Sequence, residues 1–177
     1  LSGGDPLALT DVQLFELIAA IEVIPHVKRL RIHSRLPIVL PQRITLELCQ
    51  RLARSHLDCV MVVHANHANE LGKDVAQACA LLRQHQVQLL NQSVLLAHVN
   101  DTLTCLKELS ERLFELGIMP YYLHLPDHVA GTTHFFVSLK RGQSLVAKMQ
   151  ASMSGYLVPK LVREEPGKKS KTLYSQS

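Results

Sequence analysis

Short apolar runs alternate along this chain with longer segments in which apolar residues recur every three or four positions. Four runs are rich in β-branched or aromatic residues, begin about thirty residues apart and predict strands at 29–34, 59–64, 88–93 and 119–125. Strands joined by helical segments of that length are typical of parallel βαβ units. The pattern therefore predicts an α/β protein, and right-handed crossovers leave a doubly wound sheet or a barrel.

Four segments beside these strands have helical periodicity. Thr10 opens the first in a capping-box pattern with Gln13, and the last begins after Asp101 and ends at Gly117. The apolar stripes predicted to face the core are Val12, Phe15, Leu17, Ile18 and Ile21; Leu46, Leu48, Leu52 and Ala53 after Thr45; Val75, Ala78, Cys79 and Leu82; and Leu103, Leu106, Leu109, Leu113 and Leu116.

The pattern changes near residue 140. Residues 142–153 predict one helix ended by Gly155, residues 156–162 predict a strand, and a polar tail rich in Pro, Gly and Lys follows from Glu164. We therefore expect two parts, 1–140 and 141–177.

Polar residues gather where each predicted strand ends, which is the face on which (β/α) barrels build their active sites. This recurrence favours a barrel over a doubly wound sheet. The clusters are His33, Ser34 and Arg35; His64, Asn66, His67 and Asn69; Asn91, Gln92 and Ser93; and Tyr122, His124 and Asp127.

Composition narrows the function classes. The chain has 177 residues, 47% hydrophobic and 19% charged, with a net charge of +4. No basic stripe interleaved with aromatics is present, so we expect no nucleic-acid partner. No apolar run approaches a membrane span, and the first residues have no secretory signal pattern, so we expect a cytoplasmic protein. The missing initiator Met suggests a fragment.

The four cysteines, Cys49, Cys59, Cys79 and Cys105, are spaced by 10, 20 and 26 residues and match no zinc or iron–sulfur signature. We expect buried, reduced thiols. A metal-hydrolase alternative would use His64, His67 and Glu70, but the helical metalloprotease spacing is absent.

Several short motifs carry chemistry, and each also has a plain structural explanation. Gly3-Gly4-Asp5 allows close backbone approach and can accept from an amine, or it is a turn. The cluster at 33–35 can bind a carboxylate or a ribose, or it is a helix cap with surface charge. Lys171 can bind a carbonyl cofactor if its amine loses a proton, or it is one of several solvated tail lysines.

In their order along the chain, these motifs resemble the lysine 2,3-aminomutase family of radical S-adenosylmethionine (SAM) enzymes. The strings Tyr-Tyr-Leu-His at 121–124 and Ser-Gly-Tyr-Leu-Val-Pro-Lys at 154–160 are most similar to the bacterial branch that modifies a lysine of elongation factor P. The free-lysine branch is the close alternative. The resemblance implies a partial, TIM-barrel-like radical SAM (β/α) barrel with a C-terminal helix and a cofactor-binding segment, corresponding to the family's C-terminal half.

The resemblance also implies site residues. Lys171 would bind pyridoxal phosphate, and Tyr122, Asp127 and Glu164 would bind the substrate, with Glu164 standing where the clostridial type has Asp. The residues that would bind SAM are Gly3, Gly4, Asp5, His33, Ser34, Arg35, His64, Asn66, Asn91, Gln92 and Ser93.

The implied reaction converts lysine to β-lysine with pyridoxal phosphate, SAM and a 4Fe-4S cluster. The family's three-cysteine cluster motif is not in this sequence, so the cluster ligands would lie outside it and no metal ligand is expected within it. We therefore expect these residues alone to be inactive, with exposed barrel edges. The expected partners are lysine or a lysine on elongation factor P, and a homo-oligomer is allowed. A non-catalytic SAM- or pyridoxal-phosphate-binding remnant is the alternative from another class.

Overall fold

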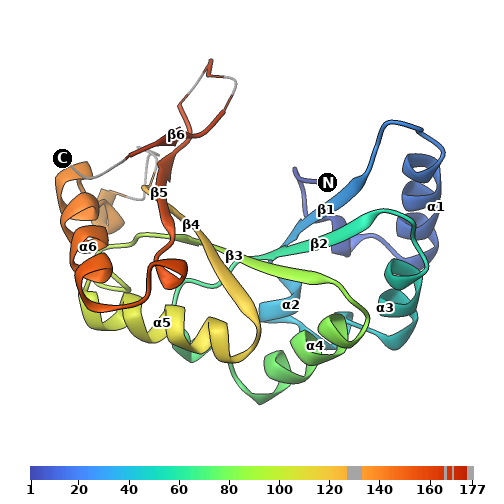
Figure 1. Cartoon of the computed structure of the whole chain (residues 1–177), viewed down its shortest axis with the longest axis horizontal. Helices are drawn as coiled ribbons and strands as arrows, with labels where there is room; N and C mark the ends of the chain where they lie inside the picture. The colour runs from blue at the N-terminus through green and yellow to red at the C-terminus, as the bar shows by residue number, and fades with distance from the viewer. Residues whose placement is uncertain (127–132, 166, 169, 175–177) are drawn as a thin grey trace. The chain divides into compact units, whose positions relative to one another are not determined.

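The computed structural model describes residues 1–126, 133–165, 167–168 and 170–174. Its strands are β1 (Arg29–Ser34), β2 (Asp58–Val63), β3 (Gln88–Val94), β4 (Ile118–His124), β5 (Lys160–Arg163) and β6 (Thr172–Leu173) (Figure 1). Its α-helices are α1 (Asp11–Glu22), α2 (Leu36–Val39), α3 (Leu46–Ala53), α4 (Lys73–Gln84), α5 (Leu103–Glu115) and α6 (Leu139–Ser152). Short 3-10 turns are η1 (Pro6–Ala8), η2 (Pro41–Arg43), η3 (Ala68–Glu70), η4 (Thr133–Phe135) and η5 (Gly155–Leu157).

The four predicted strands are confirmed to within one residue at each end. The strand order in the sheet is β1-β2-β3-β4-β5-β6, and β1 with β2 and β4 with β5 pair in parallel. Parallel pairs separated by helices are the predicted βαβ arrangement. The last strand differs, because β6 pairs antiparallel with β5.

The chain divides into two compact units, each built from more than one segment. The first comprises Leu1–His64, Glu70–Leu90 and Leu116–Ile118, and the second comprises Ala65–Asn69, Asn91–Glu115 and Met119–Ser177. The division into 1–140 and 141–177 stays a prediction.

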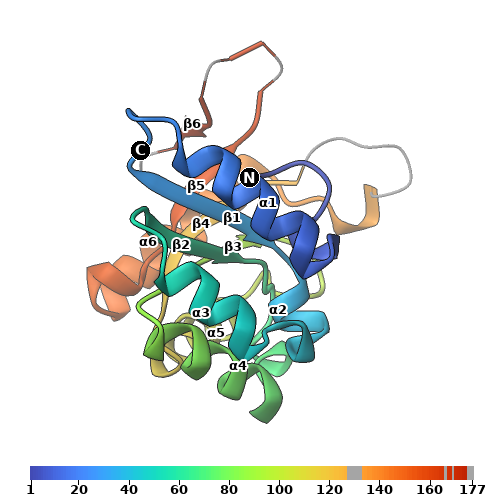
Figure 2. The ribbon, with the colours of Figure 1, turned by 90° about the vertical axis from the view of Figure 1, so that its right-hand side faces the viewer.

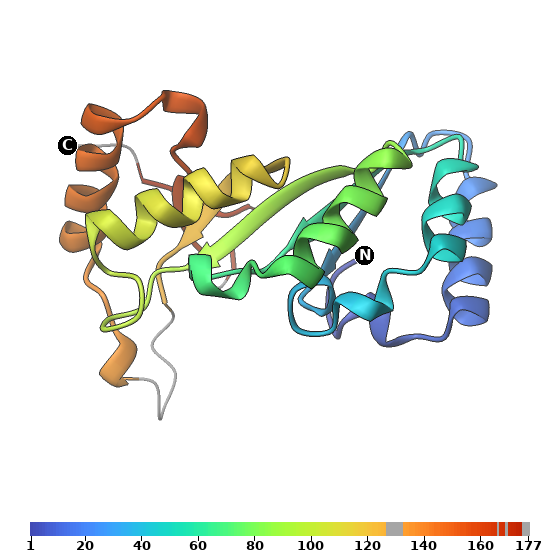
Figure 3. The same cartoon turned by 90° about the horizontal axis from the view of Figure 1, so that it is seen from below.

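In the first unit, α1 and α3 lie next to each other beside β1 and β2 (Figures 2 and 3). The capping box between Thr10 and Gln13 is confirmed at the start of α1. The predicted stripe of α1 is partly wrong: Val12 is 68% exposed, whereas Leu14 and Ile18 are fully buried. The inward face of α1 is therefore rotated away from the face that the periodicity favoured.

The stripes of the next two helices had different outcomes. Leu48 and Leu52 of α3 are buried as predicted, but Leu46 is 53% exposed and Ala53 is exposed. For α4 all four predicted positions are buried.

The second unit has one apolar core between α5, α6 and the strands. Leu106, Leu109 and Leu113 of α5 are buried as predicted, but Thr102 rather than Asp101 caps the helix, accepting from the Cys105 N–H. The buried members of the core cluster are Leu95, Leu106, Leu123, Leu125, Val137, Leu145, Val146, Met149 and Leu161.

The C-terminal predictions needed three corrections. The helix predicted from 142 begins at Leu139, where Ser138 accepts from the Arg141 N–H. The strand predicted from 156 begins only at Lys160, because Pro159 has no N–H to donate to a ladder and η5 precedes it. The polar tail returns as β6.

The four thiols are free, but only two are buried as predicted. Burial raises the pKa of Cys49 and of Cys79 to about 11. Cys59 and Cys105 are half-buried. Across the part of the chain that the structure describes, no helix has the length and apolar character to span a membrane.

We predict that Gly117→Ala lowers the free energy of unfolding by about 1–2 kcal/mol, the cost of a left-handed backbone for a residue with a Cβ. Gly117 has φ +72°, and an added Cβ would also meet the Arg83 side chain. The matched control is Gly155→Ala, since Gly155 has no positive φ and open space around it. Urea unfolding measures both, and equal stabilities would contradict the prediction.

Candidate functional site

The hairpin of β5 and β6 places Lys171 by its register. Arg163 faces Thr172 and Val162 faces Leu173 in the antiparallel pair. Continued by one residue on each strand, this register sets Glu164 opposite Lys171. Glu164 and Lys171 are seven residues apart in the sequence, and this is the spacing of a facing pair across the hairpin.

Lys171 lies within a cluster of side chains, which we call the lysine cluster: Lys171, Glu164, His124 and Tyr122. The Lys171 Nζ donates to the Glu164 Oε1, lies 3.2 Å from the His124 Nε2, and is 5.5 Å from the centroid of the Tyr122 ring. The Lys171 side chain is only 27% exposed. These contacts contradict the reading of Lys171 as a solvated tail lysine.

Strand β4 supplies the other two members. Tyr122 and His124 are two residues apart, so they point to the same face of β4, and their rings meet edge-on at 5.9 Å. Tyr122 faces Lys160 and His124 faces Val162 in the parallel pairing with β5. The carboxyl ends of β4 and β5 therefore meet at one edge, where the hairpin brings Lys171.

Polar contacts around Glu165 link it to Lys168 and Tyr174 in the hairpin. The Tyr174 hydroxyl donates to the Glu165 Oε1 at 2.8 Å, and Lys168 forms an ion pair with the same carboxylate. These contacts hold the pKa of Glu165 below its usual value and raise the pKa of Lys168. Tyr174 also packs on the apolar core, which ties the end of β6 to the body of the second unit.

His124 was not among the predicted site residues, although it appeared in the strand-end cluster. The signal that could have found it is its alternation with Tyr122. Of the predicted substrate residues, Tyr122 and Glu164 both contact Lys171. Asp127 lies outside the described residues.

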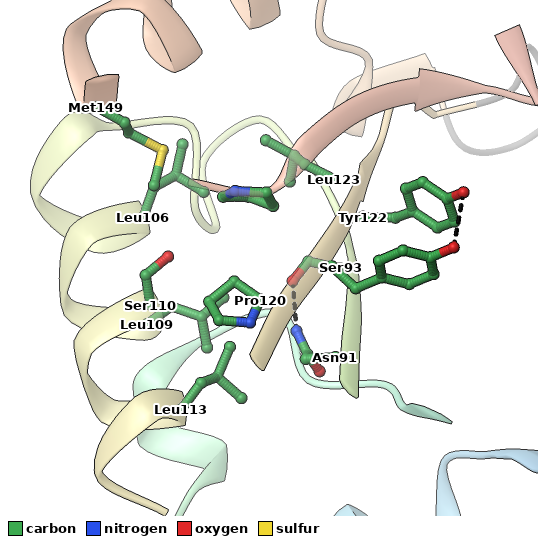
Figure 4. Close-up of a pocket in the computed structure, with 12 residues that line it drawn as sticks. Asn91, Ser93, Leu106, Leu109, Ser110, Leu113, Pro120, Tyr122, Leu123 and Met149 are labelled. Carbon is green, nitrogen blue, oxygen red and sulfur yellow. Dashed lines mark hydrogen bonds between the residues drawn. The ribbon is translucent and has the colours of Figure 1, made fainter. Parts of the chain in front are cut away.

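Asn91 and Ser93 lie on the helix-covered face of β3, where they line a small cavity together with leucines of α5 (Figure 4). The Asn91 side chain accepts from the Ala65 N–H at 2.9 Å and donates to the Ala65 carbonyl at 3.1 Å and to the Ser93 Oγ at 2.8 Å. Ser93 donates to the same carbonyl. Both side chains thus hold the segment after β2, and a direct cofactor contact stays a prediction.

Asn66 belongs to a neighbouring network. Its side-chain oxygen accepts from the Val94 N–H at 2.8 Å, while the buried Asn100 donates to the Asn66 and Val94 carbonyls. Gln92 is different, because alternation directs it to the face opposite Asn91. Its Oε1 is buried and has no hydrogen-bond partner among the described residues.

The predicted SAM residues of the first unit gather around the end of β1. The Asp5 Oδ1 accepts from the Leu7 N–H at 3.0 Å, and its Oδ2 accepts from the Arg35 N–H at 2.9 Å. Gly3 and Gly4 are exposed and have φ of +90° and +62°, conformations that favour glycine. The N-terminal turn is therefore bonded to the strand end through Asp5.

The remaining predicted SAM residues of the first unit have further contacts. The buried Ser34 accepts from the Leu36 N–H at 3.0 Å, and the Arg35 guanidinium pairs with Glu70 at 3.0 Å. The rings of His33 and His64 lie edge-on, 6.1 Å apart. The structure thus brings together the first-unit residues of the predicted set.

Metal-ligating side chains do not form a group among the described residues. Within residues 1–126, 133–165 and the described positions beyond them, no group of three His, Cys, Asp or Glu side chains could hold a metal ion. Glu70 pairs with Arg35, and the His67 Nδ1 accepts from the Asn69 N–H. The described residues therefore do not fit an iron–sulfur cluster.

No protein-family model matches the chain. Among solved structures, a radical SAM methyltransferase from Sphaerobacter thermophilus is similar with a TM-score of 0.51 and 14% identity, over 76% of this chain and 40% of that one. A likeness at this identity bears on the fold alone. The predicted class of fold, a partial (β/α) barrel of the radical SAM type, is confirmed.

Curated relatives named L-lysine 2,3-aminomutase match nearly the whole chain. The L-lysine 2,3-aminomutase of Haemophilus influenzae is 53% identical over 175 residues, which is 99% of this chain and 52% of that protein. The protein of the same name from Escherichia coli is 53% identical over 97% of this chain and 50% of its own length. That from Clostridium subterminale is 42% identical over 97% of this chain and 41% of its own length.

The chain is a homologue of the L-lysine 2,3-aminomutases and corresponds to their C-terminal half, as predicted. It spans about half the length of the curated relatives it matches.

We predict that Asn91→Ala lowers the free energy of unfolding by about 1–3 kcal/mol, because it leaves the Ala65 N–H without its buried partner and removes one of the two donors to the Ala65 carbonyl. The control is Gln88→Ala on the same strand, where the side chain is exposed and the expected change is within about 0.5 kcal/mol. Denaturant unfolding measures both. An Asn91→Ala variant as stable as the control would contradict the structural role of this amide.

Proposed function

We propose that the protein containing this chain is a lysine 2,3-aminomutase that uses SAM, a 4Fe-4S cluster and pyridoxal phosphate. The observation that carries the proposal is the lysine cluster: a single lysine, spaced and oriented by a hairpin register, is held at the edge where two parallel strands end. The relatives' shared name supports the choice of reaction.

The residues at this edge fit pyridoxal phosphate. Lys171 offers a half-buried primary amine, and Glu164 offers a carboxylate that is 64% exposed and able to accept from a second ammonium group. Tyr122 presents a ring face that suits a cation. When bound, pyridoxal phosphate supplies the electron delocalisation that lets an amino group move between neighbouring carbons.

The chain's own residues would orient the substrate. Glu164 would receive the side-chain ammonium of lysine once Lys171 no longer occupies it, and Asp127 would be the second carboxylate. Tyr122 would shield one side of the reacting carbons from water, as its half-buried position allows. The α-amino group of the substrate must be free to bond to the cofactor. Free lysine, rather than a lysine within a polypeptide, therefore fits this chemistry best.

The first unit supplies residues that suit the methionine part of SAM. Each Asp5 oxygen accepts one backbone bond, and a carboxylate has about four lone-pair sites, so Asp5 retains capacity for an ammonium group. Gly3 and Gly4 leave their backbone exposed for close approach. In the second unit, the buried Gln92 Oε1 is an acceptor without a partner among the described residues, and a polar ligand would supply one.

Several finer points belong to the proposal. The motifs at 121–124 and 154–160 favour the branch that supplies β-lysine for modification of elongation factor P, with metabolic free-lysine aminomutase as the alternative. A cytoplasmic location and a homo-oligomeric state stay predictions. A non-catalytic remnant that only binds SAM or pyridoxal phosphate is the second candidate, and it differs by forming no β-lysine.

We predict that Lys171→Ala in the full-length protein reduces β-lysine formation at least about 1,000-fold, because the cofactor loses its covalent anchor. Lys168→Ala is the control, since the Lys168 ammonium pairs with Glu165 instead of the cluster. Chromatographic assay of β-lysine from lysine and SAM measures both. Activity of Lys171→Ala within tenfold of wild type would contradict the assignment.

We further predict that residues 1–177 prepared alone without oxygen contain no 4Fe-4S cluster and do not turn over SAM. The reason is that the described residues offer no group of three metal ligands. Iron and acid-labile sulfide analysis provides the check, with the full-length protein as the positive control at about four of each per chain. Stoichiometric iron and sulfide on residues 1–177 would contradict this prediction.

A further inference from the structure

His124 is the member of the lysine cluster to which neither the motifs nor the proposed function gives a role. It is the last residue of β4, half-buried, and its Nε2 lies 3.2 Å from the Lys171 Nζ. The strand fixes its backbone, and the Tyr122 ring meets the imidazole edge-on. The imidazole is therefore held on a rigid element beside the reactive amine, as a positioning group needs to be.

The hydrogen-bonding capacity of the two groups decides their roles. An ammonium has three donors and no acceptor, and a neutral imidazole has one acceptor nitrogen. The contact is attractive only when the His124 Nε2 carries no proton and its Nδ1 carries the hydrogen. Glu164 accepts from the same amine. The two acceptors, His124 at the end of β4 and Glu164 directly after β5, therefore fix the direction of the Lys171 side chain.

We infer that His124 is a positioning residue for Lys171. It holds the amine at the strand edge, where the amine, after losing a proton to solvent, bonds to the carbonyl carbon of pyridoxal phosphate while the carbonyl oxygen leaves as water. This inference rests on the proposed function and assigns a residue that the family motifs did not. Protonation of the imidazole removes the acceptor and sets a second cation beside the ammonium. The hydrogen bond from Lys171 to the imidazole therefore forms only above the pH at which an imidazole takes up a proton, which is ordinarily near 6.5.

Other titratable groups lie near His124 and Lys171 and could also change their protonation with pH. Glu164 follows β5, Lys160 faces Tyr122 across the β4–β5 pairing, and the Tyr122 phenol lies on β4 itself. Carboxylates ordinarily titrate well below pH 6, whereas phenols and lysines ordinarily titrate well above pH 8. A transition between these limits that depends on residue 124 is therefore attributable to the imidazole.

The test uses the full-length protein as wild type, His124→Leu, His124→Gln and His26→Gln. His26 is an exposed histidine outside the lysine cluster and serves as the matched control. Each protein is mixed with pyridoxal phosphate at a series of pH values and sampled over time. Borohydride then fixes the cofactor to the amine that carries it, and mass spectrometry of peptides measures occupancy at Lys171. Circular dichroism confirms that each variant is folded.

We expect His124→Leu to slow cofactor attachment at Lys171 about tenfold at about pH 8, because the amine is then less often held in the direction that reacts. His124→Gln should recover most of that loss, because its amide oxygen can accept. Below about pH 6.5 the wild type and His26→Gln should lose occupancy more steeply than His124→Gln. A purely structural histidine would not produce that difference in pH dependence.

Two outcomes separate this inference from the proposed function. If wild type carries the cofactor on Lys171 and both His124 variants match its occupancy at every pH, the role of His124 is wrong and the proposed function stands. If wild type carries no cofactor on Lys171, the proposed function itself fails.

Discussion

The antiparallel register between β5 and β6 is the constraint on which the candidate site depends. Arg163 faces Thr172, and so the next facing positions are Glu164 and Lys171. A slip of one residue would turn Lys171 to the other face of the hairpin. It would then lose the carboxylate of Glu164 and the ring of Tyr122 together. The placement of one reactive amine thus depends on a ladder of two residue pairs.

Contacts outside the ladder keep this short register fixed. The N–H of Tyr174 donates to the Leu161 carbonyl at 3.0 Å, and the Tyr174 side chain packs on the apolar core. Leu161 is itself buried in that core, which is built on α6 and β4. The Glu165 carboxylate then joins Tyr174 to Lys168 across the loop. The burial of apolar side chains thus anchors the hairpin to the core, while Glu164 and Lys171 pair beyond its ladder.

Local sequence patterns were sufficient for strands β1 to β4 and for most helix positions. The Thr10 capping box and the stripe of α4 are set by neighbouring residues, and both were predicted correctly. The inward face of α1 was not, because Val12 and Leu14 are equally apolar and only packing in the first unit decides which is buried. Strand β6 has two residues, too few to form a pattern.

For the candidate site, as for the fold, the sequence indicated which residues belong together but not the long-range contacts between them. The resemblance assigned Glu164 and Lys171 to one site, but nothing local revealed the hairpin that makes them face each other. Asn91 and Ser93 share a strand face by alternation, yet the sequence does not say that α5 covers that face. His124 remained out of the predicted set for the same reason: its partner is 47 residues away.

Peptide mapping of borohydride-reduced full-length protein tests the central claim most directly. The account predicts that pyridoxal phosphate is fixed to Lys171 at about one equivalent per chain, with Lys168 and Lys169 unlabelled. Label on either of those neighbouring lysines, or on none of the three, would contradict it.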